Sequence, residues 1–159
     1  MAVVTKYGRS YKDPTATLLI DPVFSEGRPR QVNSGAVAVA NGDSATSKHY
    51  LGKIASNAVP SPLGILYHDA LTGVTSYDIG LELNGAAVNV NCFAAALNLT
   101  VAGSKAMLAA VATANLGKRV WELLGLASDP GVEYDIIGTM NQAATAAGSL
   151  AGFFIYSRK

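Results

Sequence analysis

One segment near the middle of the chain constrains the fold most strongly: residues 74–83, which read VTSYDIGLEL. Every second side chain of this segment is apolar: Tyr77, Ile79, Leu81 and Leu83. The residues between them are polar or small, and such a period of two predicts a β-strand that is buried on one face. A Thr-Gly pair precedes the segment and an Asn-Gly pair follows it, and both pairs favour turns.

Other segments have the length and composition of short strands, so that the chain contains roughly seven to nine of them, separated by turns. The clearest are residues 35–40, 46–54, 63–71, 86–93, 133–140 and 149–157. In the second of these, Lys48, Tyr50 and Ile54 are expected to point to the side opposite His49, Leu51 and Lys53. The pattern predicts a mainly β fold, an antiparallel β-sandwich or jelly roll with one or two short helices.

Three segments are harder to assign from their residues. Residues 93–99 are rich in alanine, which favours a helical turn, and are followed by an extended pattern. Residues 105–114 have the propensity of a helix, and residues 116–126 fit a two-turn helix that Gly125 ends.

The strands at residues 133–140 and 149–157 are expected to form the last hairpin. The final strand is apolar on both faces, so it belongs in the middle of a layered structure or against a partner.

The first 35 residues differ from the rest. They hold three of the six prolines, and only residues 16–20 fit a short strand. A segment of this length without regular structure is unusual in a compact domain and is normally disordered or functional. We therefore predict an extended N-terminal arm over residues 1–35 and a β-sandwich domain over residues 36–159. The arm either packs on its own domain or reaches a neighbouring subunit.

The charge content is low for a folded protein of this size. Half of the 159 residues are apolar and 14% are charged, against about 25% in typical domains. So few charges predict an apolar surface that a partner covers, as in an oligomer or an assembly component. The net charge is +1 without a run of Lys or Arg, which argues against nucleic acid as the main partner.

Cysteine content and hydropathy predict where the chain is made. Cys92 is the single cysteine, which excludes an intrachain disulfide and a thiolate metal cluster. The first residues lack the apolar core of a signal peptide, and no run of eighteen apolar residues occurs. We expect a protein made in a reducing cytoplasm that neither spans nor binds a membrane.

The residues that carry chemistry do not form a recognisable catalytic or metal-binding pattern. Two histidines are too few for an imidazole metal triad, and His68 and Asp69 are neighbours on a strand whose side chains point to opposite faces. Asp78 and Glu82 lie about 13 Å apart along one strand, which suits a solvated face better than a glycosidase pair. The sequence therefore predicts no enzyme activity, no cofactor and no metal site. The single tryptophan is expected in the core, although an exposed indole would suit sugar stacking.

In pattern and order, the chain from about residue 35 resembles the small decoration, or cement, proteins of tailed-bacteriophage heads. The segments that carry the resemblance are residues 38–45, 48–54, 66–69, 77–82, 117–126 and 134–137. The resemblance implies a module on the outer surface of an icosahedral virion. Such a module binds adjacent major capsid proteins and opposes the internal pressure of the DNA.

The resemblance assigns no role to an individual residue, so the contact residues come from side-chain type. Tyr and Arg are enriched at binding hot spots. We expect the arm to contact the capsid through Tyr7, Arg9, Tyr11, Phe24, Arg28 and Arg30. The expected partners are the major capsid protein and one or two further copies of the chain, as a dimer or trimer.

Other functions remain open at this point. A carbohydrate-binding β-sandwich on a virion would attach to a host surface and would need exposed aromatic side chains in a groove. A coat or tube subunit would assemble by itself. An enzyme has no positive support in the sequence.

Overall fold

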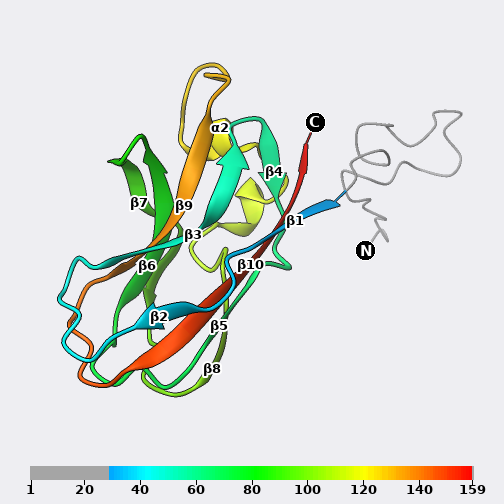
Figure 1. The fold of residues 1–159 in the computed structure, drawn as a ribbon. Coiled ribbons are helices and arrows are strands. Elements are labelled where there is room, and N and C mark those ends of the chain that lie inside the picture. Colours follow the sequence, from blue (N-terminus) through cyan, green and yellow to red (C-terminus); the bar gives the residue numbers. More distant parts are fainter. Residues whose placement is uncertain (1–28, 159) are drawn as a thin grey trace, which may run out of the picture.

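A computed structural model describes residues 29–158 of the chain (Figure 1). The described part begins with a strand, β1 (Pro29–Asn33), that pairs with the last strand of the chain. The strand predicted at residues 16–20 and most of the predicted arm lie outside the described residues. No helix in the described part is long and apolar enough to cross a membrane.

Residues 29–158 form a β-sandwich of two mainly antiparallel sheets, which confirms the predicted fold class. After β1 the strands are β2 (Val37–Val39), β3 (Lys48–Ala55), β4 (Ala58–Pro60), β5 (Ile65–His68), β6 (Tyr77–Leu83), β7 (Ala86–Leu97), β8 (Gly103–Ala106), β9 (Glu133–Met140) and β10 (Gly148–Arg158). Between β8 and β9 lie a 3-10 turn, Thr113–Asn115, and the single-turn helix α2 (Val120–Leu123).

The first sheet is organised around β10, which has neighbours on both sides (Figure 1). On one side β1 pairs with residues 153–157 and β2 with residues 148–150. On the other side β4 pairs with residues 156–158 and β5 with residues 150–153, and β8 pairs with β5 at the edge. The strand that is apolar on both faces therefore lies in the middle of a sheet, as its sequence predicts.

The second sheet has the strand order β3-β9-β6-β7. Its centre includes β6, which lies in the alternating segment of residues 74–83, and Tyr77, Ile79 and Leu81 are buried as predicted. The core lies between the two sheets. Phe93 of β7 and Phe154 of β10 meet there, with ring centroids 5.1 Å apart.

Four predictions of local structure were wrong. Residues 94–96 belong to β7, because pairing with β6 outweighs the helical preference of alanine. The segment at 105–114 holds the end of β8 and turns, and helix α2 is one turn long instead of two. β9 and β10 do not form a hairpin, because they belong to different sheets.

A bulge in β3 corrects the predicted facing of that strand. The register with β9 shifts between Tyr50 and Gly52, so both Leu51 and Ile54 point into the core and Lys53 points outward. The backbone of Gly52 has a φ of 144°, a conformation that favours glycine. A strict period of two cannot reveal such an extra residue.

Candidate functional site

The most distinctive surface of the described structure is the outward face of the six-stranded sheet, which we call the outer face. The register pairs place the following residues on it: Pro29, Gln31, Asn33, Ala38, Val59, Ile65, Tyr67, Ser104, Ala106, Ser149, Ala151, Phe153, Ile155 and Ser157. None of these described strand residues carries a charge. The outer face therefore lacks the charged side chains that normally cover a large sheet surface in contact with water.

Apolar side chains form two adjoining hollows on the outer face. The first, of about 230 Å³, is lined by Gln31, Leu63, Ile65, Tyr67, Phe153 and Ile155. The second, of about 540 Å³, shares Leu63 and Ile155 and extends to Pro29, Val59, Pro62 and Ser157. Tyr67 is 49% exposed and meets Phe153 edge-on, with ring centroids 5.8 Å apart. These hollows provide rigid aromatic and aliphatic contacts, and none of the side chains that line them is an acid, a base or a cysteine.

The outward face of the four-stranded sheet is different, because it carries charges that pair with one another. Lys48 forms an ion pair with Glu82, and Lys53 lies 3.5 Å from Asp135. Glu82, predicted to be solvated, is only 3% exposed. The backbone of β7 folds over the neighbouring Gly80 and leaves no room there for a side chain. The charge asymmetry between the two faces makes the outer face the candidate binding surface.

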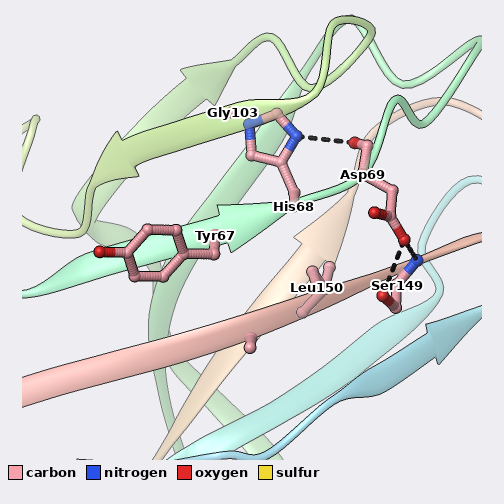
Figure 2. Close-up of a pocket in the computed structure, with 7 residues that line it drawn as sticks. Tyr67, His68, Asp69, Gly103, Ser149 and Leu150 are labelled. Atoms are coloured by element: carbon pink, nitrogen blue, oxygen red, sulfur yellow. Dashed lines mark hydrogen bonds between the residues drawn. The ribbon is translucent and has the colours of Figure 1, made fainter.

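A separate hollow of about 220 Å³ brings a serine, an aspartate and a histidine together (Figure 2). Ser149 donates two hydrogen bonds to Asp69, from its backbone N–H and from its hydroxyl, both of 2.8 Å. They hold the pKa of the Asp69 carboxyl below its ordinary value. The His68 Nδ1 donates to the backbone carbonyl of Asp69 at 2.9 Å and not to its carboxylate.

This arrangement cannot act as a Ser-His-Asp triad. A triad requires the histidine to accept the serine proton and the aspartate to orient the histidine. Here the Ser149 hydroxyl is bound to the aspartate, and His68 is buried on the strand face opposite Asp69, as the alternation of side chains predicts. The hydrogen bonds instead join the loop after β5 to the start of β10.

The other titratable groups with perturbed pKa values also have structural roles. The hydroxyl of Ser56 and the N–H of Gly131 donate to Asp129, which lowers the pKa of that carboxyl and fixes the loop before β9. Burial raises the pKa of the Cys92 thiol to about 12. Within residues 29–158, no three His, Cys, Asp or Glu side chains lie close enough to hold a metal ion.

Trp121 offers no open sugar-binding platform. It lies in helix α2, is half-buried, and its backbone N–H donates to the carbonyl of Ser56. The indole Nε1 is buried and lacks a hydrogen-bond partner among the described residues. The exposed tyrosines, Tyr50 and Tyr67, lie on the outward faces of different sheets and do not form one aromatic groove.

The arm residues selected from the sequence are only partly placed. Tyr7, Arg9, Tyr11, Phe24 and Arg28 lie outside the described residues. Arg30 lies in β1, is exposed and pairs across the sheet with Tyr156. The outer face was not predicted as a surface from the sequence. The signal for it lay in the last strand, whose second apolar row includes Phe153 and Ile155.

Comparison with solved structures relates the fold to two virus particles. The chain is similar to a chain in the capsid of Ralstonia phage GP4, with a TM-score of 0.58 and 15% sequence identity over 94% of this chain and 92% of that one. It is also similar to a chain in the capsid asymmetric unit of cyanophage Pam1, with a TM-score of 0.54 and 13% identity over 97% of this chain and 98% of that one. At these identities the likeness shows a shared fold.

No protein-family model and no curated protein matches the sequence.

Proposed function

We propose that the protein is a structural component of a bacteriophage virion that binds the outside of the capsid and cements adjacent major capsid proteins. The observation that carries this proposal is the near-complete two-way coverage of chains from two phage capsids. The likeness therefore extends over nearly the full length of both compared chains.

The surface chemistry supports binding as the activity. The outer face offers uncharged apolar hollows, and the Ser149, Asp69 and His68 geometry gives no activated nucleophile. Affinity for the shell would come from apolar burial and from hydrogen bonds, with no reaction step. Contact with several subunits at once strengthens such binding by roughly 10²–10⁴-fold without any new type of contact.

In this account the N-terminal arm supplies contacts to the major capsid protein through Tyr7, Arg9, Tyr11, Phe24, Arg28 and Arg30. The β-sandwich, which begins with β1 at Pro29, forms the body that sits on the shell, as a dimer or trimer. The chain is made in the host cytoplasm and joins the virion there. The carbohydrate-binding alternative is less well supported, because the exposed aromatic side chains do not gather in one groove.

Inactivation of the gene in the phage that encodes the protein tests the cementing function. Particles without the protein should release DNA at lower temperature than wild-type particles, and purified protein added back should restore DNA retention. If the purified protein does not bind these particles and DNA release is unchanged, the cementing function is wrong. A glycan array then tests the carbohydrate-binding alternative.

A further inference from the structure

The outer face raises the question of what covers it. Its two hollows form one continuous apolar strip, because Leu63 and Ile155 line both. Leu63 is 69% exposed and Tyr67 49% exposed among the described residues. The strip extends from Tyr67, which lies opposite Ala151 in the register, to Ser157, a length of about 20 Å at ~3.3 Å per residue.

Pro29, the first residue that the structure describes, lies at the rim of this strip. Pro29 lines the second hollow and lies opposite Ser157 in the register of β1 and β10. Residues 1–28 are therefore attached at one end of the strip. Any segment among them that matches the strip is held near it by the covalent bond to Pro29.

One segment of residues 1–28 matches the strip in charge and in length. Residues 14–20 read PTATLLI and carry no charge, whereas Asp13 and Asp21 flank them. Seven residues span up to about 23 Å when extended, close to the ~20 Å of the strip. Leu18, Leu19 and Ile20 supply the branched apolar side chains that such hollows accommodate.

The connection between this segment and Pro29 is long enough to reverse direction. Residues 21–28 span up to about 28 Å when extended, whereas a segment packed on a sheet lies only about 10 Å from it. The connection contains Pro22 and Gly27, residue types that favour turns. The segment can therefore run back from the Ser157 end of the strip toward Ala151.

We propose that residues 14–20 of the same chain dock on the outer face, along the strip formed by Leu63, Tyr67, Phe153 and Ile155. A short tether gives an effective concentration in the millimolar range, which favours the chain's own segment over that of a second copy. Docking anchors the start of the arm on the sandwich and leaves residues 1–13 to extend from it. The inference does not depend on capsid binding, because it concerns the free protein.

Hydrogen exchange of the full-length free protein, followed by mass spectrometry, tests the docking. Amides of residues 15–20 should exchange at least about tenfold more slowly than in a synthetic peptide of residues 12–22, as a docking free energy of about 1.4 kcal/mol predicts. Tyr67→Asp should abolish this protection. Tyr50→Asp, a matched control on the outward face of the other sheet, should retain it.

A disulfide trap identifies which chain supplies the segment. Full-length protein with Cys92→Ser, Thr17→Cys and Leu63→Cys should form an intrachain disulfide: it should remain at monomer mass on a non-reducing gel and show no free thiol to Ellman's reagent in guanidinium. A monomer that retains both free thiols would contradict the docking. A disulfide-linked dimer would instead assign the strip to the segment of a second copy and overturn the proposal. Unprotected amides at residues 15–20, or protection that Tyr67→Asp leaves unchanged, would also overturn it.

Discussion

The imidazole of His49 lies nearly parallel to the ring of Tyr77, with ring centroids 5.8 Å apart and an angle of 20° between the planes. The His49 Nδ1 and the Tyr77 hydroxyl share a hydrogen bond of 3.2 Å. Both side chains are buried; His49 lies in β3 and Tyr77 in β6, on either side of β9 in the four-stranded sheet. Burial lowers the pKa of His49 below its ordinary value of 6.5, while the nearby Asp43 opposes this shift.

The lowered pKa predicts loss of stability in mild acid. Below about pH 6.5 the unfolded chain binds a proton at His49 that the folded chain still excludes, so folding becomes less favourable as the pH falls. The free energy of unfolding should therefore decrease from pH 7 toward pH 5. Chemical denaturation followed by circular dichroism measures it. His49→Gln should flatten the curve in this window; parallel curves for the two proteins would contradict the prediction.

Substitution of Gly138 tests how closely β9 packs against the ring of Tyr77. A Cβ at this position would overlap the Tyr77 hydroxyl and lie 2.7 Å from Cε1 of the ring. Gly138→Ala should destabilise the protein by about 1–3 kcal/mol, the usual cost of overpacking. Gly103→Ala is the matched control, because a Cβ there has no neighbour within 4 Å among the described residues. Equal melting temperatures for the two variants would contradict the packing.

The two ion pairs on the four-stranded sheet should differ in their contribution to stability. The Glu82 side chain is 4% exposed, so Lys48→Met leaves a nearly buried carboxylate without its cation and should cost about 1–3 kcal/mol. Lys53→Met breaks a more exposed pair and should cost less than about 1 kcal/mol. Urea denaturation at pH 7 measures both values. A larger loss for Lys53→Met would refute the assigned difference.

Cys92 should be unreactive in the folded protein. Its pKa of about 12 leaves almost no thiolate at pH 8, and the thiolate is the species that attacks disulfide reagents. Ellman's reagent should therefore report one thiol per chain only after unfolding in guanidinium. Rapid reaction of the native protein would contradict the burial of this thiol.

The arm prediction is tested by substitution within residues 1–28. Replacing Tyr7, Arg9 and Tyr11 together by Ala should weaken binding to capsids by more than about tenfold, as expected for hot-spot residues. Ser10→Ala with Ser25→Ala is the control, since small polar side chains contribute little. Sedimentation of fluorescent protein with capsids measures the binding. Equal binding of the two variants would exclude these three residues as contacts.

The sequence predicts features that depend on local periodicity and fails where distant pairing decides. The alternation at residues 74–83 correctly predicted the buried row of β6, because one face of that strand packs on the core. The alanine-rich residues 94–96 became strand because β6 pairs with them. β9 and β10 are close in sequence, yet they belong to different sheets, and no local signal distinguishes that crossing from a hairpin.

The candidate surface shows the same limit. The second apolar row of β10 was visible in the sequence, but the other residues of the outer face come from separate segments. Leu63 and Tyr67 join Phe153 only because β5 pairs with β10 in one particular register. The charge-poor composition predicted that an apolar surface exists, and only the fold shows which sheet carries it.

Cryo-electron microscopy of virions from the phage that encodes the chain tests the central claim most directly. The account predicts density for this β-sandwich on the outer surface of the shell, repeated with the capsid symmetry and in contact with at least two major capsid proteins. A reconstruction of intact virions that lacks this density outside the shell, with the protein recovered only from the soluble lysate, would contradict the account.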